Sequence, residues 1–166
     1  MIYYFLPSFT GNSKENVTIK HLLTHSSGIK SYYKFFLEEE IMDRKDIVNN
    51  IIKMDLEFEP GSQYSYSDLG IILLMEICEI VSHRSIDSMA NKWIYNPLGM
   101  NSTYYKPDKI LFSKIVPTEF DSLYRGRMIQ GEVHDENTFL MGGVSSHAGI
   151  FSTSQNLANY AQMYIN

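Results

Sequence analysis

The pattern of apolar and polar positions predicts a chain rich in helices. The apolar run over 68–81 is interrupted by Glu76 and Glu79, which is typical of a helix buried except along one narrow strip. Earlier in the chain, Asp43 precedes apolar residues at helical spacing, and this predicts a helix over 43–54 with Asp43 as its N-cap. We expect the helix over 68–81 to be central to the fold.

Shorter patterns predict three further helices. Thr18 can cap a short helix that Gly28 is suited to end. Residues 86–95 carry apolar side chains at helical spacing, and Trp93 in this stripe is expected in the core. At the end, "STSQNLANYAQMYIN" offers Ser and Thr caps before another apolar face.

Residues 104–135 differ, because they show no sustained helical period. Short alternating pieces such as "KIVPTEF" and "YRGRMIQGEV" predict short strands and loops. The fold class is therefore α+β and helix-rich. No repeat or low-complexity linker divides the sequence, so residues 1–166 are expected to form one domain.

Composition narrows the set of partners. The formal net charge is -5 and the charges are scattered, so neither nucleic acid nor an anionic membrane is an expected partner. No stretch approaches the ~20 apolar residues of a membrane span, and the opening "MIYYFLPSF" lacks the basic flank of a signal peptide. Cys78 lies in an apolar run and is expected to be a small buried thiol.

Four segments follow one another in a recognisable order: "VTIKHLLTHSSGI", "PGSQYSYSDLGIILLMEICEIVS", "IYNPLGMNSTYY" and "GEVHDENTFLMGGVSSHAGIFSTSQNLANYAQMYIN". Together they resemble the beta-lactamase-related serine hydrolases, which include class C beta-lactamases, D-alanyl-D-alanine carboxypeptidases and related esterases. The resemblance covers about residues 3–166. It implies a partial beta-lactamase/transpeptidase-like fold that lacks most of its central antiparallel sheet. It also implies a small-molecule or cell-wall substrate, no cofactor, and a place in the bacterial periplasm or cell envelope.

The stretch "YSYSDLG" contains the catalytic candidates, Tyr66 and Asp68. In the resembled family a Ser-x-x-Lys motif supplies the nucleophile and a Tyr-x-Asn motif supplies a tyrosine as general base, the role that the resemblance implies for Tyr66. A phenol of pKa ~10 needs a neighbouring cation for this role. Asp68 replaces the asparagine, and an ionised carboxylate cannot donate to a substrate carbonyl. This favours an ester or modified cell-wall substrate over a β-lactam. A polar turn and helix cap is the alternative.

The nucleophile is harder to place. Ser-x-x-Lys occurs twice, at Ser27 with Lys30 and at Ser31 with Lys34. Chance alone gives roughly one match in this composition, so the two matches carry little information. In the family the segment like "LLTHSSGI" follows the nucleophile by several dozen residues, which implies a serine and lysine upstream of Met1. Ser31 stays an alternative, because it could begin a helix through "YYKFFLEEE".

Two later segments supply the candidate substrate-lining residues. His134, Asp135, Glu136 and Asn137 adjoin in a predicted loop, and this density of polar groups suggests the wall of a substrate cleft. His147 fits a His-x-Gly triplet, but in the family this segment precedes the catalytic strand. The resemblance therefore implies that His147 is a loop residue near the site.

Other interpretations of the polar residues stay open. His134 and Glu136 share one side of an extended segment and could hold a metal ion, whereas Asp135 would point away. A hydrogen-bonded structural loop is the simpler interpretation, and we expect no metal. His21 and His25, four residues apart on the short helix, are most simply carbonyl caps.

The expected function is that of a partial serine hydrolase acting through a serine ester. It is expected to be weak or inactive, because the nucleophile and the closing strand would lie outside this sequence. The alternative is a non-catalytic module that keeps the cleft and binds cell-wall fragments or a partner chain. The full gene could carry a further domain upstream. A missing sheet would leave apolar helix faces uncovered, so self-association is expected.

Overall fold

The computed structural model of the protein describes residues 1–41 and 43–165. The chain forms two compact units, Met1–His83 and Arg84–Asn166, and each is described by itself. The expectation of one domain over 1–166 stays a prediction. No helix in the described part of the chain is long and apolar enough to cross a membrane.

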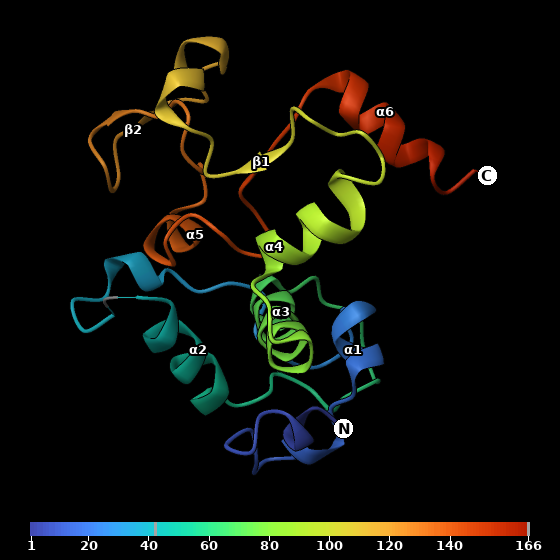
Figure 1. Ribbon diagram of the computed structural model, residues 1–166. Helices are drawn as coiled ribbons and strands as arrows, with labels where there is room; N and C mark the ends of the chain where they lie inside the picture. Colours follow the sequence, from blue (N-terminus) through green and yellow to red (C-terminus); the bar gives the residue numbers. More distant parts are fainter. Residues whose placement is uncertain (42, 166) are drawn as a thin grey trace. The chain divides into compact units, whose positions relative to one another are not determined.

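Among its described residues, the first unit contains three α-helices and three short 3-10 helices. In chain order these are η1 (Ile2–Tyr4), η2 (Lys14–Asn16), α1 (Ile19–Leu23), η3 (Phe35–Leu37), α2 (Arg44–Lys53) and α3 (Asp68–Ser82). Figure 1 shows α3 between α1 and α2, and both of these helices contact it. The expected central helix is therefore confirmed within this unit.

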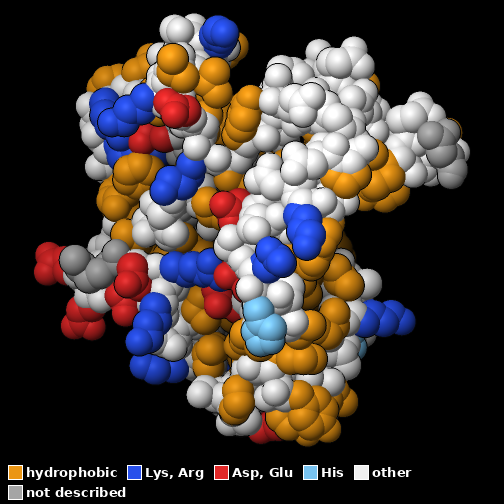
Figure 2. Space-filling model, in the orientation of Figure 1, with side chains coloured by type: hydrophobic (Ala, Val, Ile, Leu, Met, Phe, Trp, Pro, Cys, Tyr) orange, Lys and Arg blue, Asp and Glu red, His pale blue; other side chains and the backbone are white. Residues whose placement is uncertain are grey.

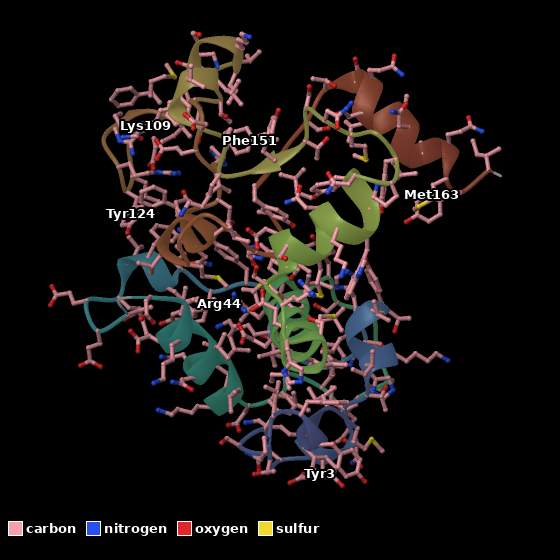
Figure 3. The ribbon with its side chains drawn as sticks, viewed as in Figure 1. Tyr3, Arg44, Lys109, Tyr124, Phe151 and Met163 are labelled. Atoms are coloured by element: carbon pink, nitrogen blue, oxygen red, sulfur yellow. The ribbon has the colours of Figure 1, made fainter. Side chains whose placement is uncertain are left out.

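The sequence explains why α3 occupies this place. Leu69, Ile72 and Leu73 have no exposed surface, so the helix buries most of its circumference. Its polar strip, Glu76 and Glu79, faces Arg44 of α2, the residue labelled in Figure 3. Arg44 Nε donates to Glu76 Oε1 at 2.6 Å and Arg44 Nη2 to Glu79 Oε2 at 2.7 Å. The predicted polar strip of α3 thus forms ion pairs with the neighbouring helix α2.

The two flanking helices, α1 and α2, each begin directly after an N-cap residue that the sequence predicts. Asp43 caps α2, because its Oδ1 accepts from the backbone N–H of Lys45 and of Asp46. Thr18 caps α1 by accepting from the backbone N–H of His21 at 3.1 Å. The prediction that Gly28 ends α1 is wrong, since α1 ends at Leu23 and Gly28 serves a contact described below.

The second unit holds short helices and two small antiparallel sheets. In chain order its elements are α4 (Ile86–Ala90), the π-helix η4 (Asn91–Tyr95), β1 (Tyr104–Tyr105), the 3-10 helix η5 (Lys109–Lys114), β2 (Phe120–Asp121), β3 (Arg127–Met128), α5 (Glu136–Leu140), β4 (Ile150–Phe151) and α6 (Ser154–Gln162). Strand β1 pairs with β4, and β2 pairs with β3. Tyr104 lies opposite Phe151, and Phe120 lies opposite Met128. The predicted short strands over 104–135 are confirmed.

Several apolar side chains that the patterns assign to helix faces are exposed. The expectation that Trp93 lies in the core is wrong, since it is 54% exposed. Leu157 on α6 is also exposed, and so are Met1 and Tyr4 at the chain start, where Figure 2 shows apolar side chains gathered at the bottom of the view. A helical period shows which residues share a face, but not whether another element covers that face.

Candidate active site

Tyr66 lies in the loop that leads into α3, and its side chain is partly exposed. The side chain is 54% exposed, whereas the next residue, Ser67, is 1% exposed. Ser67 is the N-cap of α3: its Oγ accepts from Gly70 N–H at 2.9 Å and donates to the Lys30 carbonyl at 2.8 Å. A half-exposed tyrosine therefore directly precedes the hydrogen-bonded start of α3.

The segment 25–31 is hydrogen-bonded along its length to residues 57–68, the segment that contains Tyr66 and is called the Tyr66 loop below. Its carbonyls accept backbone N–H groups from along 57–68, in the following pairs: Gly28 from Glu57 at 2.7 Å, Ser26 from Gly61 at 2.8 Å, His25 from Ser65 at 2.8 Å and Ser31 from Asp68 at 2.9 Å. A Cβ on Gly28 would lie 2.1 Å from the Phe58 carbonyl oxygen, so only glycine permits this approach. Two motifs distant in sequence thus form one structure.

His25 contacts the same loop with its side chain. Its Nδ1 accepts from Ser67 N–H at 3.1 Å, and its ring lies 4.5 Å from the Tyr66 ring between centroids. The interpretation of His25 as a carbonyl cap is wrong, because its side chain accepts a hydrogen bond from a backbone amide instead of donating one to a carbonyl. His21 instead completes the cap of α1, where its Nδ1 accepts from Thr18 N–H at 3.4 Å.

Asp68 governs the electrostatics of Tyr66. The negative charge of Asp68, partial burial, and a hydrogen bond to Asp68 raise the pKa of Tyr66 above its usual 10. The phenolate form of Tyr66 is therefore less favoured than that of a free tyrosine. Lys30 is not among the groups that shift the pKa of Tyr66, and its Nζ lies 5.3 Å from the ring centroid of Tyr33. Tyr66 needs a further cation before it can act as a base.

Neither Ser-x-x-Lys match has the setting of a nucleophile. Ser27 is buried, and its Oγ accepts from Ile29 N–H at 3.2 Å within a turn. Ser31 does not begin a helix, because the next helical element is η3 (Phe35–Leu37), four residues later. These positions support the prediction that both matches are coincidental.

In the second unit the residues of "HDEN" separate into different roles. Asp135 is the N-cap of α5 and accepts from Thr138 N–H at 2.6 Å, so Glu136 and Asn137 lie in the first helical turn. The expectation of a loop is therefore wrong for these two residues. Asn137 is buried. His134 pairs with Glu119, Nε2 to Oε1 at 2.5 Å, rather than with Glu136.

His147 and Asp135 are brought together by the fold. The side chain of His147 is 2% exposed, and its Nε2 lies 3.2 Å from Asp135 Oδ1 and 3.1 Å from Thr138 Oγ1. Its Nδ1 lies 2.8 Å from Ser145 Oγ. Burial would raise the pKa of Asp135, but hydrogen bonds from His147 and Thr138 and the charge of His147 lower it. Ser145 is 1% exposed, so the hydroxyl end of this hydroxyl–imidazole–carboxylate row is closed to solvent.

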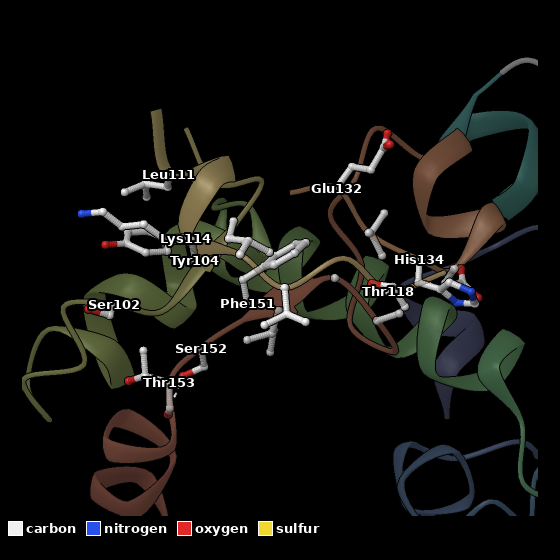
Figure 4. A pocket seen from close by; sticks show the side chains of 17 residues that line it. Ser102, Tyr104, Leu111, Lys114, Thr118, Glu132, His134, Phe151, Ser152 and Thr153 are labelled. Carbon is white, nitrogen blue, oxygen red and sulfur yellow. Dashed lines mark hydrogen bonds between the residues drawn. The ribbon is translucent and has the colours of Figure 1, made fainter. Parts of the chain in front are cut away.

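A pocket of about 850 Å³ lies in the second unit, beside the β1–β4 sheet. Figure 4 shows Ser102 and Lys114 toward one end and Glu132 and His134 toward the other, with Phe151 between them. Asp135 also lines the pocket, whereas Glu136, Asn137 and His147 do not. Two of the five predicted substrate-lining residues therefore border a cavity large enough for a small ligand.

Sequence reasoning missed the ion pair that holds this pocket wall. Arg125 Nε donates to Asp121 Oδ2 at 2.6 Å, and both side chains are 4% exposed. Arg125 also donates to the carbonyls of Val133 and His134, directly before Asp135. The hydrogen bond from Arg125 contributes most to lowering the pKa of Asp121 to about 2. The available signal was "DSLYR", an acid and a base four residues apart.

No group of three His, Cys, Asp or Glu side chains among the described residues is placed to hold a metal ion. His134 is paired with Glu119, and Asp135 is occupied by His147 and Thr138. The geometry within residues 1–41 and 43–165 therefore offers the metal interpretation no support.

The helix-rich architecture of the described residues, with its two short sheets, matches a part of a known fold. The family described as Beta-lactamase matches residues 3–165, and the chain belongs to it. A solved class C beta-lactamase covers 97% of this chain and 41% of its own length, with a TM-score of 0.72 at 20% identity. The fold class expected from the sequence, a helix-rich part of the beta-lactamase/transpeptidase fold, is confirmed.

Curated bacterial proteins are similar over nearly the whole chain. A Bacillus subtilis protein named N-acetylmuramyl-L-alanine amidase is 28% identical over 98% of this chain and 42% of its own length. An Escherichia coli K12 protein named "Putative D-alanyl-D-alanine carboxypeptidase" is 32% identical over 96% of this chain and 41% of its own length. The chain thus spans about two fifths of the length of these relatives.

Proposed function

We propose that this chain forms the part of a serine acyl-transfer hydrolase that holds the general base, Tyr66. The observation that supports this most is the setting of Tyr66, an exposed phenol at the anchored start of α3, two residues before Asp68. The names of the relatives point to bacterial cell-wall peptides, so an amide or ester of that class is the proposed substrate.

In the proposed reaction a serine hydroxyl attacks the substrate carbonyl while Tyr66 takes the hydroxyl proton. Tyr66 then returns this proton to the leaving amine or alcohol, and water hydrolyses the serine ester. Asp68 is proposed to hold the lysine of the family's Ser-x-x-Lys motif near the phenol. That cation would offset the charge of Asp68, which by itself raises the pKa of Tyr66.

The serine and the lysine of this reaction are not identified among the described residues, so the chain by itself is proposed to be inactive. A fluorophosphonate probe followed by peptide mapping tests this. We expect no labelled serine. Labelling of Ser27 or Ser31 would show that a nucleophile was overlooked, and would overturn this part of the proposal.

The substrate class is tested by calorimetric titration with a muropeptide that ends in D-alanyl-D-alanine. Saturable binding is expected, and Tyr66→Phe should weaken it because the substrate carbonyl lies near the phenol. Tyr64→Phe is the matched control, since Tyr64 lies two residues away and is 72% exposed. Equal binding by both variants would argue against a substrate at Tyr66.

The second candidate is a binding module without chemistry, and the pocket of the second unit favours it. Here the same muropeptide would be held by pocket residues such as Phe151. Binding lost in Phe151→Ser but kept in Tyr66→Phe would favour this module. The opposite result would favour the hydrolase.

A further inference from the structure

Three contacts from one residue surround Tyr66. The His25 carbonyl accepts from Ser65 N–H at 2.8 Å, on one side of Tyr66. The His25 imidazole Nδ1 accepts from Ser67 N–H at 3.1 Å, on the other side. Between them, the His25 ring lies against the Tyr66 ring at 4.5 Å, tilted by 35°. A single residue therefore fixes both neighbours of the tyrosine and one face of its ring.

The backbone of His25 has an unusual conformation that makes these contacts possible. His25 has φ +51°, in the left-handed region that residues with a Cβ rarely adopt. This turn lies just after α1 and directs both the carbonyl and the imidazole toward the Tyr66 loop. Such strain persists only where surrounding contacts enforce it, and it is frequent at functional sites.

The contact with Ser67 also fixes the chemistry of the imidazole. A backbone N–H can only donate, so Nδ1 must carry its lone pair toward Ser67, and the neutral ring must carry its proton on Nε2. His21, on α1, accepts with its Nδ1 from Thr18 N–H instead, so it provides an internal comparison.

We propose that His25 is the positioning residue of Tyr66, which sets the direction of the phenol by clamping residues 65 and 67 and stacking on the ring. This inference rests on the proposed role of Tyr66 as base. His25 touches neither substrate nor reacting atoms in this scheme. Together with the hydrogen bond to Asp68, it restricts the rotation of a side chain that is 54% exposed and would otherwise sample several rotamers.

Three substitutions separate the two side-chain contacts. His25→Asn keeps an acceptor near the place of Nδ1 and tolerates the left-handed backbone, but it removes the ring. His25→Phe keeps a ring and removes the acceptor. His25→Ala removes both. His21→Asn is the matched control, because it changes a second histidine, on α1, whose Nδ1 accepts from Thr18 rather than from Ser67.

The experiment is NMR on the labelled 166-residue chain, with the position of the Tyr66 ring, the hydrogen exchange of the Ser67 amide and the tautomer of His25 as readouts. The unaltered chain should show the Nε2–H tautomer. His25→Ala and His25→Phe should speed exchange of the Ser67 amide about tenfold. His25→Asn should restore its protection but lose the ring contact to Tyr66. His21→Asn should change none of these readouts.

Each result decides the inference. Loss of the Tyr66 ring position in His25→Ala, together with restored protection of the Ser67 amide in His25→Asn, supports it. A Tyr66 ring that keeps its position in all three variants, or an Nδ1–H tautomer, overturns it. General unfolding would be visible as shifts in α2, which lies outside these contacts. These readouts do not depend on activity, so a failure of Tyr66 in catalysis would refute the proposed function and leave the positioning result standing.

Discussion

Ser67 is the residue whose removal should disturb the Tyr66 loop most clearly. Its hydroxyl makes two hydrogen bonds inside the structure, accepting from Gly70 N–H at 2.9 Å and donating to the Lys30 carbonyl at 2.8 Å. Ser67→Ala leaves both backbone groups without these partners. The residue is 1% exposed, so water cannot readily replace the lost hydroxyl.

The size of the effect follows from these two bonds. Loss of an N-cap costs about 1 kcal/mol, and the Lys30 carbonyl adds about 1–2 kcal/mol as a polar group left unsatisfied. The expected loss of unfolding free energy is therefore about 2–3 kcal/mol. With a urea dependence of about 2 kcal/mol per molar, the midpoint of unfolding should fall by about 1–1.5 M.

Urea titration followed by circular dichroism measures this shift. Ser65→Ala is the matched control, because Ser65 lies in the same loop and contributes its backbone N–H, which the substitution keeps. Its midpoint should move by less than about 0.3 M, as for most surface substitutions. Equal midpoints for Ser67→Ala and Ser65→Ala would refute the reasoning that Ser67 anchors α3 to segment 25–31.

Three further predictions concern other parts of the chain. Arg125→Lys keeps the charge but loses the forked contacts to Asp121 and the Val133 carbonyl, so urea titration should show that the free energy of unfolding falls by about 2 kcal/mol. The control, Arg127→Lys, changes an exposed arginine and should alter this free energy little. The Asp121 pKa of about 2 lies below its ordinary 3.8, so its stabilisation is present above pH 4 and lost toward pH 2; acid titration should show this loss, and Asp121→Asn should flatten it. Sedimentation should show self-association that Leu157→Glu reduces, and a monomer at all concentrations would contradict the expectation.

The helices could be predicted because their signals are local. The apolar run over 68–81 and the Asp43 cap each depend on residues within a few turns, and the structure confirms both helices. The spacing of Tyr66 and Asp68 just before an apolar run likewise placed them at a helix start. The same kind of local pattern gave a wrong prediction for Trp93, because the periodicity of one helix does not show whether another element packs against that face.

The contacts that build the candidate site are not local. His25 Nδ1 meets Ser67 N–H across 42 positions of sequence, and Gly28 meets the Phe58 carbonyl across 30. A histidine near a helix end gives no sign of such a partner. The close pairing of His147 with Asp135 depends on two turns whose paths the sequence does not specify.

The most direct test of Tyr66 as a base is the amidase rate of a chimera. In it, this chain replaces the segment of the Bacillus subtilis relative that it matches, which is 42% of that protein. We predict an active chimera in which Tyr66→Phe lowers kcat/KM by about 10²–10⁴-fold, the range of general acid–base catalysis, while Tyr64→Phe stays within about twofold. A chimera that is inactive, or one in which Tyr66→Phe retains the parental rate, would contradict the assignment of Tyr66 as the base.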